Sequence, residues 1–142
     1  MQLVEELNIL PGVHETINDA RTVGLRLAMA SSSPRDWVVH HLHRLGIYDV
    51  FDCILTREDV TRVKPDPELF LSTVNYLSLT PAEAIVLEDS LNGVVAAKAA
   101  GIFCIAVPNP LTAQLDLDHA DLILNSMADL DLHHLLVKLD HG

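Results

Sequence analysis

Short apolar runs alternate along this chain with segments whose apolar residues recur every three or four positions. Such runs predict buried strands, and the three-to-four spacing predicts helices with one face toward a core. Strands that alternate with helices pair in parallel, and helices then cover both faces of the sheet. The expected strands cover residues 25–30, 51–56, 84–87, 102–107 and 122–124. The sequence therefore predicts an α/β domain built on a mainly parallel sheet.

Turn residues place the ends of the expected helices. Gly24, Gly46 and Gly101 each follow a periodic segment, and glycine is the usual residue just beyond a helix C-terminus. Thr80-Pro81, with Glu83 three residues after the threonine, forms the capping box of one short turn. The expected helices cover residues 13–23, 34–45, 67–77, 91–100 and 127–139.

Charge and cysteine content exclude several classes of protein. With nine Lys/Arg against twenty Asp/Glu and a formal net charge of −11, the chain lacks the basic patch that nucleic-acid binding requires. Cys53 and Cys104 lie in apolar runs and make no disulfide framework, so we expect buried thiols in a reducing compartment. The first ten residues lack the basic region of a signal peptide, and no apolar run is long enough to span a membrane. We therefore expect one cytoplasmic domain that binds neither nucleic acid nor membrane.

Polar residues lie at the carboxyl ends of several predicted strands, as the last residue of the strand or directly after it. Ser31, Thr56, the pair Glu88-Asp89 and the pair Pro108-Asn109 all occupy such positions. In open parallel sheets, ligands bind just outside the carboxyl ends of the strands. These residues are therefore the first candidates for a functional site.

Glu88 and Asp89 are adjacent carboxylates between a predicted strand and a predicted helix. Mg²⁺ typically takes one or two protein carboxylates together with waters and substrate phosphate oxygens, so the pair suits that ion. The alternative is that Asp89 or Ser90 simply caps the following helix. The two interpretations can coexist.

Lys64 and the serine run supply groups that favour an anion. Lys64 precedes Pro65, which biases its backbone toward extended geometry, and an ammonium beside two carboxylates balances the charge of a phosphoryl group. Ser31 ends a predicted strand, and Ser32 and Ser33 open the next helix, where hydroxyls and backbone N–H groups form an anion site. The alternatives are a solvated loop lysine and ordinary capping serines.

Other familiar sites are missing from the pattern. The eight histidines show no zinc-ligand spacing, and no Walker A loop or Gly-x-Gly-x-x-Gly motif is present. Ser31 lacks the Gly-x-Ser-x-Gly turn of a serine nucleophile.

Three segments in order, LAMASSS at 27–33, VKPDPELF at 63–70 and VLEDSLNGVVAAKAAG at 86–101, resemble the haloacid dehalogenase (HAD) superfamily. The nearest resemblance is to its beta-phosphoglucomutase-like and phosphoglycolate-phosphatase-like hydrolases. It implies a Rossmann-like three-layer core and a Mg²⁺-dependent phosphohydrolase that acts on a small phosphorylated metabolite through an aspartyl-phosphate. It also implies roles for individual residues: Ser31 holds the transferring phosphoryl group, Lys64 neutralises charge around it, Glu88 and Asp89 hold Mg²⁺, and Ser90 and Asn92 lie in the same loop, with Asn92 a candidate phosphate contact.

The sequence departs from this family in two places. It contains no Asp-x-Asp-Gly-Thr/Val motif, which carries the nucleophile and the acid/base aspartate. We therefore expect a chain without its first strand and most of its helical cap, inactive as it stands, with residues 1–10 as the returning end of the cap and 11–142 as the core. Pro34 and Arg35 replace the lysine and asparagine that grip phosphate in the mutases. Arg35 still offers a bidentate anion contact, which favours a phosphatase over a mutase.

Two further hypotheses remain at this point. A non-catalytic domain that binds metal, phosphate or a partner chain fits the missing nucleophile, and an uncovered sheet edge would invite self-association. A receiver-type phosphoacceptor domain fits less well, because such a domain places its acidic pair before its lysine. With only two expected carboxylate ligands, Mg²⁺ affinity should be weak.

Overall fold

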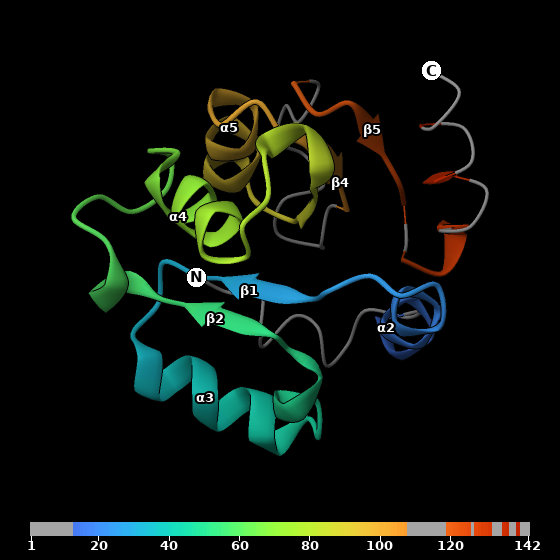
Figure 1. Cartoon of the computed structure of the whole chain (residues 1–142), viewed down its shortest axis with the longest axis horizontal. Coiled ribbons are helices and arrows are strands. Elements are labelled where there is room, and N and C mark those ends of the chain that lie inside the picture. The colour runs from blue at the N-terminus through green and yellow to red at the C-terminus, as the bar shows by residue number, and fades with distance from the viewer. Residues whose placement is uncertain (1–12, 108–118, 126, 132–134, 137–138, 140–142) are drawn as a thin grey trace.

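The structure is a computed structural model that describes residues 13–107, 119–125, 127–131, 135–136 and 139 (Figure 1). The stub at residues 1–10 and the strand end at Pro108-Asn109 lie outside these residues. No helix in the described ranges is both long and apolar enough to span a bilayer.

All strand pairing among the described residues is parallel. Strands β1 (Ala28–Ala30) and β2 (Cys53–Leu55) form one sheet. Strands β3 (Ile85–Glu88), β4 (Phe103–Ala106) and β5 (Leu122–Ile123) form a second sheet in that order. The predicted α/β class with parallel pairing is confirmed, but the strands fall into two sheets, because no described strand lies between β1 and β3.

The expected helices before residue 101 are confirmed to within a few residues. They are α2 (Val13–Thr22), α3 (Arg35–Arg44), α4 (Glu68–Tyr76) and α5 (Leu91–Ala99), and the short turns are η1 (Tyr48–Val50), η2 (Arg57–Asp59), η3 (Pro81–Glu83) and η4 (Met127–Asp129). Gly24, Gly46 and Gly101 adopt φ values of 82°, 72° and 75°, the left-handed conformation that ends a helix. The Thr80–Glu83 capping box is also present.

The prediction of one helix over residues 127–139 is wrong. Met127–Asp129 is a 3₁₀ turn, and Leu130 and Asp131 are not helical. Leu130 packs instead into the apolar cluster that contains Ile105. Helical bonding begins afresh where Leu135 N–H donates to Asp131 O (3.0 Å). The segment is therefore interrupted at Leu130 and Asp131, where the sequence pattern is continuous.

Helices cover both faces of the strands. Met29 of β1 packs with Val38 and Leu42 of α3, whereas Ala30 packs into the cluster that contains α4 and α5. Figure 1 shows α3 and α4 on opposite sides of the β1–β2 pair. On the β3–β5 sheet, Val86 faces the α4–α5 cluster and Ile85 faces the cluster that includes Ile17 of α2. This is the three-layer arrangement that the sequence predicts.

Both cysteines are free and buried, as expected. Burial is the main cause that raises the pKa of the Cys104 thiol to about 12, and it also raises the pKa of Cys53. Both thiols therefore stay protonated at neutral pH, which suits residues that only pack.

Asp121 joins the end of α5 to the β4–β5 pair. Its Oδ2 accepts Lys98 Nζ (2.6 Å) and the Cys104 N–H (2.8 Å). Burial favours the neutral acid, but the hydrogen bonds from Lys98 and Cys104 outweigh it, so the pKa of Asp121 lies below its usual range. The ionised carboxylate is therefore the form that the fold stabilises.

We expect Asp121→Asn to lower the free energy of unfolding by about 1 kcal/mol at pH 7, because one charge-assisted contact is lost. A lowered folded-state pKa gives stability that is present above the unfolded value of about 3.9 and is lost as pH falls through the folded value. Urea unfolding should therefore show a difference from wild type that shrinks below pH 4. Asp49→Asn, an exposed site, serves as control. A difference that is the same at pH 7 and pH 3 would contradict the assignment.

Candidate active site

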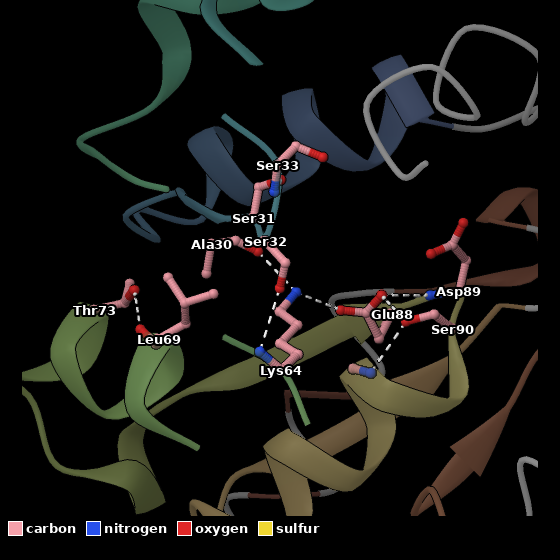
Figure 2. A network of polar contacts seen from close by, with 11 residues as sticks. Ala30, Ser31, Ser32, Ser33, Lys64, Leu69, Thr73, Glu88, Asp89 and Ser90 are labelled. Atoms are coloured by element: carbon pink, nitrogen blue, oxygen red, sulfur yellow. Dashed lines mark hydrogen bonds and ion pairs between the residues drawn. The ribbon is translucent and has the colours of Figure 1, made fainter. Parts of the chain in front are cut away.

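Lys64 joins the carboxyl ends of the two sheets. Its Nζ donates to Ala30 O at the end of β1 and to Glu88 Oε2 at the end of β3, both at 2.8 Å. The Lys64 and Glu88 side chains are only 3% and 1% exposed. The ammonium also lies 4.6 Å from the centroid of the Phe70 ring. Figure 2 shows the lysine reaching between the serine run and Glu88. Two opposite charges are thus buried and paired at the strand ends.

The loop before α4 holds Lys64 in place through its own polar groups. Lys64 N–H donates to Ser32 Oγ (3.3 Å), which ties this loop to the end of β1. Glu68 accepts the backbone N–H groups of Thr61 (2.8 Å) and Arg62 (3.1 Å). Asp66 Oδ1 accepts Glu68 N–H (2.9 Å) at the start of α4. The carboxylates of Asp66 and Glu68 therefore bond to the backbone of this loop.

Glu88 and Asp89 have different surroundings. Glu88 Oε1 accepts Asp89 N–H (3.2 Å) and Ser90 Oγ–H (3.1 Å), in addition to the lysine on Oε2. Ser90 is the N-cap of α5, since its Oγ accepts Gly93 N–H (3.0 Å). In Figure 2 the Asp89 carboxylate points away from the Lys64–Glu88 pair. Of the two capping candidates, Ser90 is thus the one that caps the helix.

The serine run lies between β1 and α3. Ser31 is fully buried; its N–H continues the parallel pairing by donating to Leu55 O (3.0 Å), and its Oγ accepts Ser33 N–H (3.1 Å). The N-cap of α3 is Pro34, which has no side-chain capping bond, so the serines are not conventional caps. The run therefore holds hydroxyls and backbone groups at the end of β1, next to Lys64.

The remaining candidate residues, Arg35, Thr56 and Asn92, make their contacts outside this cluster. Arg35 Nη1 donates to Ile54 O (3.0 Å) and lies 3.7 Å from Asp59 Oδ2. Thr56 at the end of β2 is buried and caps η2 through Asp59. Asn92 is exposed in the first turn of α5. The structure thus brings together Ser31, Ser32, Lys64, Glu88 and Asp89, while the phosphate roles of Arg35 and Asn92 stay predictions.

The donor set suits a hard cation only in part. Glu88 and Asp89 supply carboxylate oxygens, the ligands that Mg²⁺ prefers, but within the described ranges no three His, Cys, Asp or Glu side chains gather as a metal site. The Glu88 carboxylate already accepts three donors, so a metal ion bound to it would share its oxygens with Lys64, Asp89 N–H and Ser90. A magnesium ion here would keep most of its waters, which that ion commonly does.

Gly93 is a site residue that the sequence analysis did not single out. A Cβ at this position would overlap the Cγ, Cδ and Oε2 atoms of Glu88. The only available sequence signal is a glycine inside a predicted helix, which lowers helix stability and therefore asks for a packing reason. Here the reason is the buried glutamate.

We expect Lys64→Met and Glu88→Gln each to lower the free energy of unfolding by about 3–5 kcal/mol, because each substitution leaves the partner's charge buried without an opposite charge. The double variant should lose clearly less than the sum of the two, since it removes both charges. Urea unfolding of the four proteins measures this coupling. Strictly additive losses would mean that the pair is not joined in solution.

Gly93→Ala should destabilise the chain, although the same change in an open helix position stabilises by about 1 kcal/mol. The added methyl group displaces Glu88 and with it Lys64. Ala99→Gly, at an exposed position in the last turn of the same helix, is the control and should lose less than about 1 kcal/mol. Thermal unfolding of both variants compares them; a Gly93→Ala protein more stable than wild type would rule out the close packing against Glu88.

The family model and the similar proteins point to the same protein family. Residues 1–107 match the family model described as haloacid dehalogenase-like hydrolase. A Bacillus subtilis (strain 168) protein named "Putative phosphatase YhcW" is 45% identical over 92% of this chain and 59% of its own length. Hexitol phosphatase B of Escherichia coli (strain K12) is 36% identical over 96% of this chain and 62% of its own length. The chain thus spans about three fifths of these curated relatives.

Solved structures agree with the fold. CbbY from Rhodobacter sphaeroides, solved in complex with phosphate, is 34% identical and superposes with a TM-score of 0.80 over 90% of this chain and 60% of its own. Beta-phosphoglucomutase from Clostridium difficile superposes with a TM-score of 0.82 at 29% identity, over 99% of this chain and 61% of its own. The order of the strand-end motifs, the parallel three-layer core and these matches agree: the chain belongs to the haloacid dehalogenase-like hydrolases.

Proposed function

We propose that this chain forms the phosphate- and magnesium-binding part of a phosphohydrolase that acts on a small phosphorylated sugar or polyol. The observation that carries the proposal is the cluster of Ser31, Lys64, Glu88 and Asp89 at the carboxyl ends of β1 and β3. Relatives named for phosphatase activity on hexitols and on phosphorylated carbohydrates support the substrate class.

In this proposal the serine run and Lys64 hold the phosphoryl group. The Ser31 hydroxyl accepts Ser33 N–H, which leaves its own proton to donate to a phosphoryl oxygen. The Lys64 ammonium, fixed by Ala30 O and Glu88, brings a positive charge to the place where negative charge grows in the transition state. The buried setting strengthens that interaction relative to water.

Asp89 would hold Mg²⁺, and Glu88 would act mainly by fixing Lys64. A bound magnesium ion supplies charge neutralisation at the phosphoryl oxygens. The prediction that Glu88 is also a direct ligand stays open, because its carboxylate already accepts three donors. A single direct carboxylate is consistent with weak affinity for the ion.

The proposal includes an unusual limit on activity. The 142 residues contain no Asp-x-Asp-Gly-Thr/Val motif, so no residue in them is assigned as the nucleophile. The chain by itself should therefore bind phosphate and Mg²⁺ without turning over substrate. This same feature favours the second candidate, a non-catalytic domain that only binds these ligands.

Amide NMR shifts during titration with MgCl₂ and with inorganic phosphate test the site. We expect shifts at Ser31–Ser33, Lys64, Asp89 and Ser90, with phosphate binding strengthened by Mg²⁺. Asp89→Asn should weaken Mg²⁺ binding by roughly tenfold or more, because it removes the charge of the proposed ligand. Asp49→Asn is the matched control and should change nothing.

Turnover separates the two candidates. Phosphate release from a panel of hexose and hexitol phosphates should be absent for the chain alone. Mg²⁺-dependent release that disappears in Asp89→Asn would show a nucleophile within these residues and overturn the proposed limit. Titrations in which neither ligand shifts the named amides would overturn the site itself.

A further inference from the structure

The first turn of α5 contains the one Asn-Gly sequence of the chain, Asn92-Gly93. Asparagine is a thermolabile residue, because its side-chain carbonyl carbon lies within reach of the next backbone nitrogen. Glycine in the following position eases the attack, since it has no Cβ to hinder the approach. Asn92 is exposed, and within the described part of the chain no hydrogen bond holds its side-chain amide. A reactive pair is therefore present beside the candidate active site.

The Gly93 nitrogen is held less firmly than the backbone nitrogens that follow it. The helical hydrogen bonds of α5 begin at Val94, whose N–H donates to Ser90 O (3.0 Å). Gly93 N–H comes earlier in the turn, where no helical carbonyl is available, and it donates instead to Ser90 Oγ (3.0 Å). One side-chain hydroxyl thus holds the nitrogen that could attack Asn92.

The same hydroxyl is tied to the candidate active site. Ser90 Oγ–H donates to Glu88 Oε1 (3.1 Å), and its lone pairs are thereby left for Gly93 N–H. Gly93 itself packs so closely on Glu88 that a Cβ at this position would overlap the glutamate side chain. Glu88 in turn pairs with Lys64. A change of the backbone at Gly93 therefore reaches the Lys64–Glu88 pair through two contacts.

We propose that Asn92 is a site of covalent modification by deamidation, that the Ser90 cap slows this reaction, and that the modified backbone weakens the Lys64–Glu88 pair. The reaction starts only when the first turn of α5 opens, because Gly93 N must leave Ser90 Oγ and turn toward the Asn92 side chain. The inference rests on the cap and on the packing of Gly93, and it does not depend on the proposed phosphatase chemistry.

The reaction needs only these two residues and water. The Gly93 nitrogen attacks the side-chain carbonyl carbon of Asn92, and the new C–N bond closes a cyclic imide. The side-chain nitrogen leaves as ammonia and takes the proton of the Gly93 N–H with it. Water then opens the ring at either carbonyl. Opening at the side-chain carbonyl gives aspartate, and opening at the main-chain carbonyl gives isoaspartate, in which the main chain continues through the side-chain carbons.

The two products differ in their effect on the fold. Aspartate adds a negative charge in the first turn of α5, where a helix N-terminus favours one, and it keeps the backbone unchanged. Isoaspartate lengthens the backbone between positions 92 and 93 by a methylene group, so Gly93 cannot keep both its bond to Ser90 and its place against Glu88. We expect the isoaspartate form to unfold at a lower temperature than the Asn92→Asp variant, which reproduces the charge alone.

Peptide mapping by mass spectrometry, after incubation of the 142-residue chain in mildly alkaline buffer, measures the conversion. Ser90→Ala removes the cap and should speed conversion at Asn92 by roughly fivefold, the factor by which loss of a capping bond favours the open turn. Ser90→Thr keeps a hydroxyl and should convert like wild type. Thr80→Ala removes the capping residue of η3, so it controls for general destabilisation and should leave the rate at Asn92 unchanged. The chain unfolded in urea gives the upper limit of the rate.

Three results would overturn the proposal. One is a folded wild-type chain that converts at Asn92 as fast as the chain unfolded in urea, and another is equal conversion of Ser90→Ala and Ser90→Thr. The third is an isoaspartate form, separated by chromatography, that unfolds at the same temperature as Asn92→Asp, which would show that the backbone change does not reach Glu88. None of these results bears on the Mg²⁺ and phosphate titrations, so the two proposals fail independently.

Discussion

The buried pair of Lys64 and Glu88 is the interaction on which the rest of the site depends. Removing two charges from water costs several kcal/mol for each ion, and their attraction offsets this only when every remaining polar atom is satisfied. Ala30 O, Asp89 N–H and Ser90 O–H meet that condition here. The pair thereby fixes the end of β1, the loop before α4 and the end of β3 to one another.

The Lys64–Glu88 pair also explains why the adjacent carboxylates of Glu88 and Asp89 have different contacts. Successive side chains of a strand point to opposite faces, so Glu88 and Asp89 cannot both turn toward the lysine. Glu88 lies on the α5 side, where Gly93 leaves room for it, and Asp89 lies on the other. Two carboxylates at neighbouring positions of the sequence thus have different surroundings, and only that of Glu88 pairs with Lys64.

The sequence predicts more of the fold than of the contacts within it. Apolar runs and Gly24, Gly46 and Gly101 are local signals, so strands and helices up to residue 107 could be placed. The break at Leu130 has no such local signal; in the structure this residue packs against the cluster that contains Ile105. The order of the motifs along the sequence predicts that Lys64 lies near Glu88 and Asp89. The spacing of these motifs does not show whether the lysine side chain pairs with a carboxylate of the protein or contacts only a ligand. It also does not show that the Arg35 side chain contacts Ile54 O and Asp59.

The site and the arrangement of the two sheets depend on the same side chain. The Lys64 ammonium binds Ala30 O at the end of β1 and Glu88 Oε2 at the end of β3, so one cation holds the carboxyl ends of both sheets at a fixed separation. The serine run that follows β1 and the Glu88-Asp89 pair at the end of β3 are thereby brought to the same end of the fold. A change that removes the ammonium therefore alters the geometry of the whole cluster and not only its charge.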